Sequence, residues 1–363
     1  MNKKEETQIY KDLLKTIDNL SFGFPKSYLK SDIALIKKLF TVDDAKDFIM
    51  MGDGWITIKS YADKNNLSEE EAKAKLEGLA NKALIFRVHK EDHDEFRQFP
   101  FVLGFLEFQV EKMDKAALMQ TGLYMISSKF GKRMSQTMPF YRTVPINKEV
   151  VEGSKVLPYD DIDAILDRHT RFAVAPCICR IMYKMKPFNK CNHPIETCIT
   201  TDDYATFYIE NKIGREITKQ EARQIMLDGE KDGRIINVTN SKDGENICSC
   251  CKCGCGMLYL KMKYPGPGTD YWSNYYSSVD NSKCVKCYTC IKKCTFGYIK
   301  KGKDGYIKID TKGCLGCGIC VKNCPTKALT LKMKKKTYEP PETYEEAVEI
   351  WQEKTVKDYK NFK

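Results

Sequence analysis

The sequence lacks the long apolar runs that mark membrane-spanning or secreted chains. No apolar run approaches the roughly 20 residues needed to cross a bilayer. The best candidate, residues 99–108, contains Glu107 and reads as a buried core segment. The charged first residues include no apolar signal-peptide segment. We therefore expect a cytoplasmic protein without membrane insertion.

Two signatures of substrate chemistry are also missing. Neither a G-x-G-x-x-G run nor a G-x4-G-K-[ST] run occurs, which argues against a flavin, nicotinamide or nucleotide site. No pair of nucleophile and base stands out either, so we predict no catalytic residue. An enzyme acting alone is less favoured than a carrier or an electron-transfer subunit.

What the sequence has in excess is cysteine, with 17 among 363 residues. A chain of this length can form two or three domains with cores of their own, so it does not depend on disulfides to fold. Reducing compartments also keep thiols free. The cysteines therefore indicate metal or redox chemistry.

The clearest pattern is a C-x2-C-x2-C-x3-C run that occurs twice near the end of the chain. The eight cysteines are Cys284, Cys287, Cys290 and Cys294, then Cys314, Cys317, Cys320 and Cys324. This run is typical of [4Fe-4S] ligation, in which three closely spaced thiolates bind three irons and a fourth ligand comes from elsewhere. Zinc sites also use C-x2-C, but rarely place four cysteines within eleven residues.

Residues 280–331 resemble the bacterial-type two-cluster ferredoxins. The resemblance implies a small α+β module with crossed ligation, in which Cys284, Cys287, Cys290 and Cys324 hold one cluster and Cys314, Cys317, Cys320 and Cys294 hold the other. Alternating residues in 305–310 and 328–333 agree with the expected strands. Thr295 departs from the family, which usually has Pro after the fourth cysteine, whereas the second repeat keeps Pro325.

Positive charge is concentrated in the same region. Residues 280–336 contain fifteen Lys, no Arg and three acidic residues, a surplus of +12 in a chain of net charge +11. Ammonium groups offset the negative charge of thiolate-bound clusters. The same lysines also suit redox partner proteins with an acidic docking face.

A second group of cysteines lies in the middle of the chain, with C-x-C-x11-C-x6-C spacing. Its members are Cys177, Cys179, Cys191 and Cys198. Four thiols spaced in this way can converge on one metal, and a third [4Fe-4S] cluster is favoured. A zinc site and unligated structural cysteines remain the alternatives. His193 is more simply a hydrogen-bonded neighbour than a ligand.

The run ICSCCKCGCG adds five more thiols: Cys248, Cys250, Cys251, Cys253 and Cys255. In an extended chain the last three would face one side and the first two the other. Gly254 and Gly256 let the backbone turn back toward an inorganic core. The run either completes the preceding site or holds a fourth cluster with it. Four cubanes would need about sixteen thiolates, so the count permits a fourth cluster without requiring one.

Residues 31–101 have the pattern of helices followed by a hairpin, and they resemble a winged helix-turn-helix domain. Ser68 and Glu71 form a capping box at the start of one helix. That helix begins with Glu69, Glu70 and Glu71, which suit the helix dipole but would repel phosphate. We expect this region to dock proteins rather than nucleic acid.

The expected fold class is α+β. Two helix-and-strand units, near 159–176 and 217–240, are predicted to bring the two middle cysteine regions together. The expected domains are a winged-helix-like domain (1–110), an α/β cysteine-rich domain (111–263), an aromatic Pro/Gly linker (264–279), a two-cluster ferredoxin domain (280–336) and a tail with a short helix (337–363). The tail helix either docks back or exchanges with a second subunit, which would make a homo-oligomer.

The middle cysteine regions and the terminal module together resemble multi-cluster iron-sulfur proteins of anaerobes. We therefore expect a protein that relays single electrons to a partner oxidoreductase. One alternative is a redox-sensing DNA-binding regulator. The other is an oxidoreductase with a substrate-accessible cluster.

Overall fold

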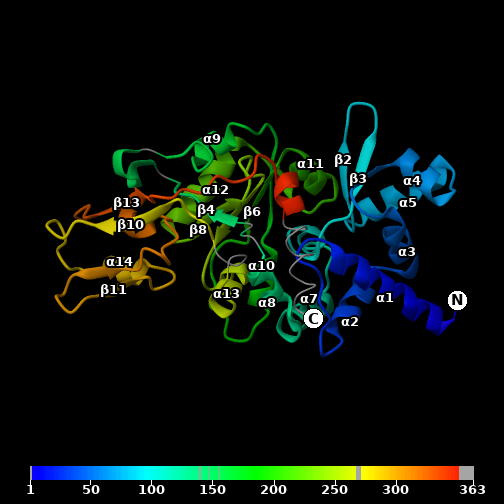
Figure 1. Ribbon diagram of the computed structural model, residues 1–363, viewed down its shortest axis with the longest axis horizontal. Coiled ribbons are helices and arrows are strands. Elements are labelled where there is room, and N and C mark those ends of the chain that lie inside the picture. The colour runs from blue at the N-terminus through cyan, green and yellow to red at the C-terminus, as the bar shows by residue number, and fades with distance from the viewer. Residues whose placement is uncertain are drawn as a thin grey trace.

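The protein has an elongated arrangement of three regions, with its N-terminal helices at one end and the repeated cysteine runs at the other (Figure 1). A six-stranded sheet lies between them. The computed structural model describes residues 2–137, 139, 141–146, 148–154, 156–266 and 271–350. Helices and strands are mixed throughout, which confirms the predicted α+β class.

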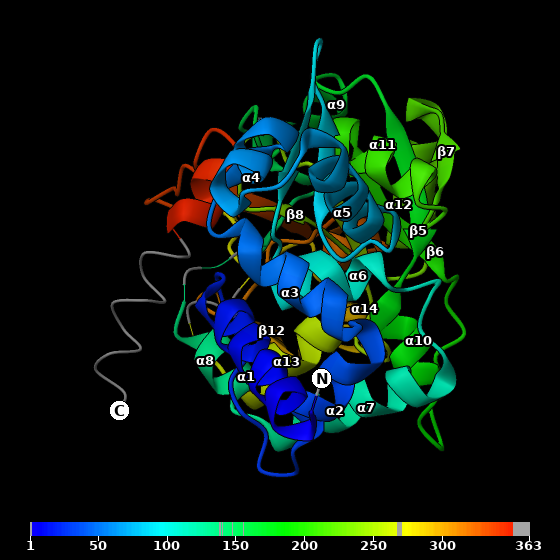
Figure 2. The same cartoon turned by 90° about the vertical axis from the view of Figure 1, so that its right-hand side faces the viewer.

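The N-terminal region consists of five helices and a small antiparallel sheet, seen from the front in Figure 2. The helices are α1 (Lys3–Asn19), α2 (Ser31–Leu39), α3 (Val42–Met51), α4 (Ile58–Asn65) and α5 (Glu69–Asn81). The strands are β1 (Trp55–Thr57), β2 (Phe86–His89) and β3 (Asp94–Arg97), in the order β1-β3-β2. Ser68 and Glu71 form the predicted capping box of α5.

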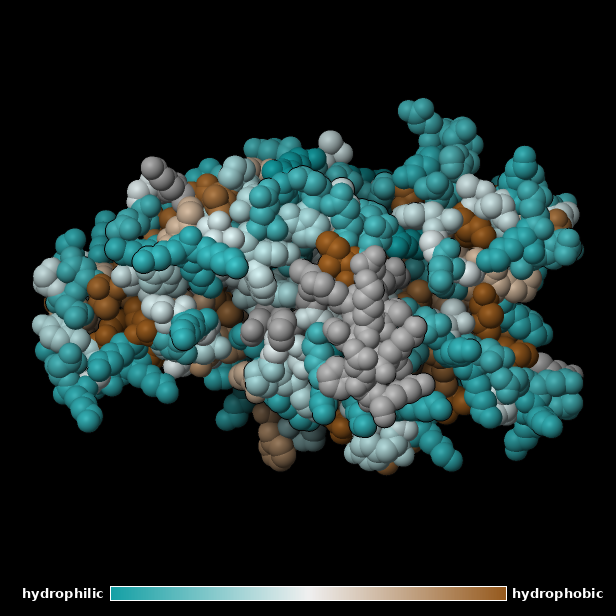
Figure 3. Space-filling view, viewed as in Figure 1, coloured by the Kyte–Doolittle hydropathy of each residue, from teal (hydrophilic) through white to brown (hydrophobic). Residues whose placement is uncertain are grey.

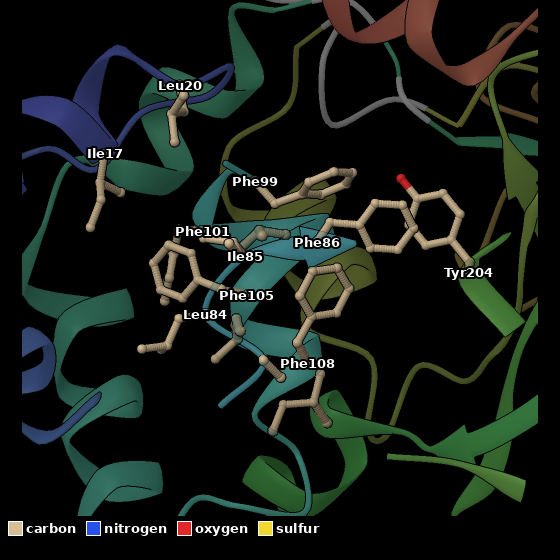
Figure 4. Packing of buried hydrophobic residues seen from close by; sticks show 14 of the residues in the cluster. Ile17, Leu20, Leu84, Ile85, Phe86, Phe99, Phe101, Phe105, Phe108 and Tyr204 are labelled. Atoms are coloured by element: carbon tan, nitrogen blue, oxygen red, sulfur yellow. The ribbon is translucent and has the colours of Figure 1, made fainter. Parts of the chain in front are cut away.

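The apolar run at 99–108 lies in the core. It forms a distorted turn, η1 (Phe101–Phe105), and a short helix, α6 (Leu106–Phe108). Figure 4 shows its phenylalanines packed with Phe86 of β2 and with Tyr204 of the middle region. The Phe86 ring centroid lies 4.6 Å from that of Tyr204 and 6.0 Å from that of Phe108. This aromatic cluster fixes the N-terminal region against the central sheet.

Two helices lie in the segment 112–135. They are α7 (Lys115–Ser127) and α8 (Phe130–Ser135). The break falls at Ser128, whose backbone is extended and bridges to Ser27. The Ser127 hydroxyl lies 2.7 Å from that of Ser27. A contact with the N-terminal region therefore ends the helix, and periodicity alone does not reveal it.

The central sheet has the strand order β4-β8-β9-β6-β5-β7, and all neighbouring strands are antiparallel. Its strands are β4 (Tyr141–Thr143), β5 (Phe172–Pro176), β6 (Glu196–Thr201), β7 (Arg215–Ile217), β8 (Ile235–Thr239) and β9 (Asn246–Cys250). Helices α9 (Ile162–Leu166), α11 (Asp202–Glu210) and α12 (Lys219–Lys231) accompany it. The two predicted helix-and-strand units are α9 with β5 and α12 with β8.

The two faces of this sheet carry different residues. Ile199 of β6 and Ile247 of β9 join the apolar cluster formed with α9 and α12. Side chains alternate along a strand, so Cys198, Cys248 and Cys250 lie on the opposite face. That face is covered by α10 (Ile178–Lys184) and α13 (Gly256–Lys263), among others. The middle cysteines are therefore directed into one side of the molecule.

The C-terminal module contains two antiparallel two-stranded sheets and two short helices. Strand β10 (Tyr275–Val279) pairs with β13 (Leu329–Met333), and β11 (Ile299–Lys301) pairs with β12 (Ile307–Ile309). The helices are α14 (Thr289–Lys293) and α15 (Ile319–Lys322). Residues 275–279 were expected to be linker, but they form β10 because their backbone pairs antiparallel with that of β13.

The tail returns to the body of the molecule. Residues 344–350 are helical, and Tyr344, Ala347 and Val348 are buried in the main core. The remaining tail prediction, from 351 onward, lies outside the described residues. No helix within the described ranges is both long and apolar enough to cross a membrane.

Candidate metal centres

The eight cysteines of the C-terminal module line two separate cavities. Cys284, Cys287, Cys290 and Cys324 line one cavity of about 20 Å³. The second, of about 30 Å³, is lined by Cys294, Cys314, Cys317 and Cys320. Each cavity therefore takes three thiols from one run and one from the other, the crossed arrangement that the resemblance implied.

The two cysteine loops follow the same backbone path. Lys286 and Tyr288 in the first loop both have a φ of 57°, and the matching Gly316 and Gly318 have φ values of 61° and 76°. Two residues with left-handed backbone, separated by one other residue, turn each chain segment around a central point. Glycine adopts this conformation without strain, whereas Lys286 and Tyr288 do so at some cost. The repeat therefore specifies a loop that wraps an enclosed group.

Backbone and hydroxyl groups point at the sulfurs of both cavities. The Ser277 amide donates to Cys314 Sγ at 3.4 Å, and the Ala328 amide donates to Cys324 Sγ at 3.3 Å. The Ser277 hydroxyl lies 3.3 Å from Cys320 Sγ. Such donors stabilise thiolate charge and raise the reduction potential of a cluster. The thiol sets, loop path and donors fit two iron-sulfur clusters.

Residues 277–331 match the family model of the 4Fe-4S dicluster domain. The match covers the two cysteine runs and the paired strands β10 and β13, so the module begins a few residues earlier than its cysteines suggest. No curated protein and no solved structure was found to be similar to the chain. The match thus assigns residues 277–331 to a 4Fe-4S dicluster domain, and it does not extend to the rest of the chain.

Six of the nine middle cysteines form a continuous group, which we call the six-thiol group. Its members are Cys177, Cys179, Cys198, Cys248, Cys250 and Cys255. Cys248 contacts Cys198 and Cys250, while Cys179 contacts Cys177 and Cys255. The Sγ atoms of Cys250 and Cys255 lie 3.4 Å apart, which closes the chain of contacts.

The other three, Cys191, Cys251 and Cys253, form a separate three-thiol group. Their Sγ atoms all lie within 4.8 Å of one another, and those of Cys191 and Cys251 are 3.6 Å apart. Sequence spacing led us to expect Cys191 to converge with Cys177, Cys179 and Cys198. The structure instead places it with the later run, because the loop after α10 carries it away from the sheet face.

The division of the ICSCCKCGCG run follows from where its strand ends. Cys248 and Cys250 share one face of β9, as alternation predicts. The strand stops at Cys250, and the turn that follows directs Cys251 and Cys253 toward Cys191. Cys255 then begins α13 and returns to Cys250. Cys251, Cys253 and Cys255 therefore do not share the face that an extended chain would give them, since the backbone turns back after Cys250.

A buried arginine lies between the two thiol groups. Arg180 is only 1% exposed, and its guanidinium donates to the Pro194 and Ser249 carbonyls and to the Thr197 hydroxyl. These partners carry no charge. Burial opposes the charged form, but the negative charges of Cys177 and Cys251 outweigh it and raise the pKa of Arg180. A buried cation of this kind requires nearby anions, which metal-bound thiolates would supply.

One further residue at the six-thiol group, Tyr141, was not predicted from the sequence. The Tyr141 hydroxyl lies 3.3 Å from Cys248 Sγ, and its ring stacks on that of Tyr271 with centroids 6.1 Å apart. Burial raises the pKa of Tyr141. Hydrogen bonds from Cys179 and Cys250 lower the pKa of Cys255 to about 5. The buried cation at this site had a local signal in the sequence, since Arg180 directly follows Cys179.

A large apolar pocket opens onto the six-thiol group. It measures about 550 Å³ and lies among α6, α7, α10 and α13. Its wall includes the thiols of Cys177, Cys179, Cys198, Cys248 and Cys250. The carboxyl of Glu107 also lines it and accepts a hydrogen bond from the Gly104 amide at 3.1 Å. Burial, with a smaller contribution from the charge of Cys248, raises the pKa of Glu107 to about 7.

The dicluster domain packs directly against the middle region. Leu315 and Ile319, beside the second cavity, belong to the same apolar core as Cys250 and Cys255. Lys322 forms an ion pair with Glu230 of α12, whose side chain is almost fully buried. The second cavity is thus the one that faces the six-thiol group.

Proposed function

We propose that this protein transfers single electrons through iron-sulfur clusters located in two regions. The dicluster domain would hold two [4Fe-4S] clusters, with Cys284, Cys287, Cys290 and Cys324 as one ligand set and Cys314, Cys317, Cys320 and Cys294 as the other. The six-thiol group would hold a further iron-sulfur centre. When bound, such clusters accept and release one electron each without forming a bond to a substrate.

The observation that carries this proposal is the position of Ile235 between the second cavity and the six-thiol group. Its side chain lines the second cavity of the dicluster domain. Its Cα is paired with that of Cys250 across β8 and β9, and paired residues place their side chains on the same face. One buried residue therefore separates the two thiol sets. This favours an electron path from the Cys284 cavity, through the Cys294 cavity, to the six-thiol group.

The lysines of the dicluster domain support docking of an acidic redox partner. Hydrophilic side chains surround this end of the molecule in Figure 3. Lys300 of β11 is directly opposite Lys308 of β12, and both are exposed. Like charges opposite each other destabilise a strand pair, so their presence favours a role in binding.

The N-terminal region supports protein docking more than DNA binding. Its helices and three strands, with β3 between β1 and β2, resemble a winged helix-turn-helix domain. The exposed first turn of α5 carries Glu69, Glu70 and Glu71. Three carboxylates at this point would repel a phosphate backbone. The Lys-rich end and the Glu-rich end would therefore contact different proteins.

Reductive titration followed by EPR tests the proposal. Anaerobically purified protein should take up about one electron per cluster, and its spectra should show magnetic coupling between neighbouring clusters. Reoxidation by a one-electron acceptor should return the same number of electrons. A protein that takes up no electrons, or that holds only zinc, would contradict the proposal.

The apolar pocket favours a second candidate function, an oxidoreductase with a substrate-accessible centre. Pockets of a few hundred Å³ with mostly apolar walls and a few polar groups are typical of small-molecule sites. Here Glu107 supplies a polar group, and five thiols form part of the wall. A small apolar ligand that alters the EPR signal of the middle centre would favour this function. Unchanged spectra with ligands of several shapes would favour simple electron transfer.

A further inference from the structure

We propose that Cys191, Cys251 and Cys253 bind a single Zn²⁺ ion, separate from every iron-sulfur cluster. This inference rests on the proposed function only in treating the six-thiol group as a different site. It assigns the three-thiol group to one ion, in place of a fourth cluster.

The spacing of the sulfurs favours one ion. Thiolates that share a tetrahedral zinc at about 2.3 Å lie about 3.8 Å from one another. The Sγ atoms of Cys191 and Cys251 are 3.6 Å apart, and all three Sγ atoms fall within 4.8 Å. In a cubane each thiolate binds a different iron, so the sulfurs lie farther apart.

The dicluster domain supplies an internal comparison. Its eight thiols surround two cavities with the donors arranged for enclosed clusters. Among the described residues, only Cys191, Cys251 and Cys253 form a set of three metal-binding side chains with all ligand atoms within 4.8 Å. The same chain therefore shows two different thiol spacings, which correspond to two kinds of metal site.

The backbone around the three thiols approaches them closely and is held there by hydrogen bonds. A Cβ at Gly254 would lie 3.1 Å from Cys191 Sγ and 3.5 Å from Cys251 Sγ, so a larger residue there would press on the Cys191 sulfur. The Asn189 side chain accepts from the Cys191 amide at 2.6 Å and donates to the Cys253 carbonyl at 3.3 Å. Asn189 thus holds the two segments at the spacing that a shared ion needs.

Buried positive charge also lies beside the site. Three thiolates and one Zn²⁺ carry a net negative charge. The Arg180 guanidinium hydrogen-bonds Cys251. Arg234 is 2% exposed and forms an ion pair with Asp232 at 3.1 Å, and it also interacts with the charge of Cys251. Its buried Nε and Nη1 atoms have no hydrogen-bond partner among the described residues. An anionic metal site would compensate the charge of Arg180 and add to the ion pair of Arg234.

The zinc would crosslink two segments of the chain and would have one coordination position open to solvent. Cys253 is exposed, so the fourth ligand of the zinc would face solvent and could be water. The ion would join two segments that lie 60 residues apart in sequence. Closing such a loop through a metal stabilises the folded chain.

Metal analysis of matched variants tests this assignment. Protein purified without oxygen, with zinc added as the probe, would be compared with Cys253→Ser and with Lys252→Ala, which changes an exposed neighbour in the same loop. We expect about one zinc per chain in the unchanged protein and in Lys252→Ala, and a loss of about fivefold or more in Cys253→Ser. Iron and acid-labile sulfide should be equal in all three proteins.

Two results would overturn the proposal. One is a loss of about four irons and four sulfides in Cys253→Ser, which would identify a cubane. The other is full zinc retention in that variant. Equal iron contents also show that Cys253→Ser has folded. Because zinc and iron are measured separately, a chain with zinc here and no iron elsewhere would refute the electron-transfer proposal and leave this one standing.

Discussion

The dicluster domain and the middle region use cysteine in different ways. In the dicluster domain four thiols line each cavity, and the residues between them wrap the loop around it. In the middle region nine thiols come from strands, turns and helix starts distant in sequence, and they separate into groups of six and three. A local loop can therefore specify a whole site, whereas a site assembled by a sheet depends on the fold and on buried counter-charge.

The largest expected effect comes from removing that counter-charge. Arg180→Leu should lower the free energy of unfolding by about 3–5 kcal/mol, since it leaves the thiolate charge of the middle region without a buried partner. Middle-region metal should be lost while the dicluster domain keeps its visible absorption. Anaerobic urea unfolding and metal analysis measure both effects.

Arg180→Lys is the matched control for this prediction. It keeps the positive charge but cannot reproduce all the hydrogen bonds of the guanidinium, so its effect should be intermediate. Equal stability of Arg180→Leu and the unchanged protein would show that the middle thiols carry no buried charge.

Single cysteine substitutions should affect the two regions unequally. Cys290→Ser removes one of four thiols from its cavity and should cost about four irons per chain. Cys198→Ser leaves five thiols in its group and should cost fewer than about two irons. Iron and sulfide analysis of the two variants gives the comparison directly. A loss of four irons from both would mean that the six-thiol group has no surplus ligand.

Surface charge at the dicluster end, and not at α1, should matter for binding an acidic redox partner. Replacing Lys300 and Lys308 with Glu should slow electron transfer to an acidic partner about tenfold at low ionic strength, and the effect should shrink as salt is added. The same change at Lys11 and Lys15, exposed residues of α1, is the control. Equal slowing in both variants would place the docking site elsewhere. Stopped-flow kinetics at several salt concentrations measures the rates.

The smallest predicted effect concerns the contact between the N-terminal and middle regions. His89 of β2 lies between Asp94 and Glu210 of α11. Burial opposes protonation, but the hydrogen bonds that the His89 ring donates to the two carboxylates outweigh it and raise the pKa of His89 above 6.5. The stabilisation is therefore complete below pH 6.5 and is lost as the pH rises through the pKa of the folded protein. His89 is partly exposed, so we expect a contribution of about 0.5 kcal/mol or less.

Unfolding experiments at several pH values check this contribution. The difference between the unchanged protein and His89→Gln should be largest below pH 6.5 and should vanish at alkaline pH. His93→Gln is the control for effects within the hairpin, because its ion-pair partners Asp92 and Glu95 belong to that hairpin and the hydrogen bond to Asp92 likewise raises the pKa of His93. A difference that grows with pH would contradict the assignment.

The sequence was sufficient to predict a site whose cysteines lie close together along the chain. The two cysteine runs specify their loops, and alternation along the 246–250 segment predicts that Cys248 and Cys250 share a face. The middle site could not be predicted in the same way. Spacing along the chain does not show that the loop after α10 carries Cys191 away from Cys179, or that Arg180 is buried beside the thiols. The strand β10 was also missed, since its partner β13 is some 50 residues away.

Iron and acid-labile sulfide per chain, measured on protein purified without oxygen, test the central claim most directly. Two clusters in the dicluster domain and one at the six-thiol group predict about twelve irons and about twelve sulfides. A value near eight would confine the clusters to the dicluster domain, and a colourless protein without sulfide would contradict the account altogether.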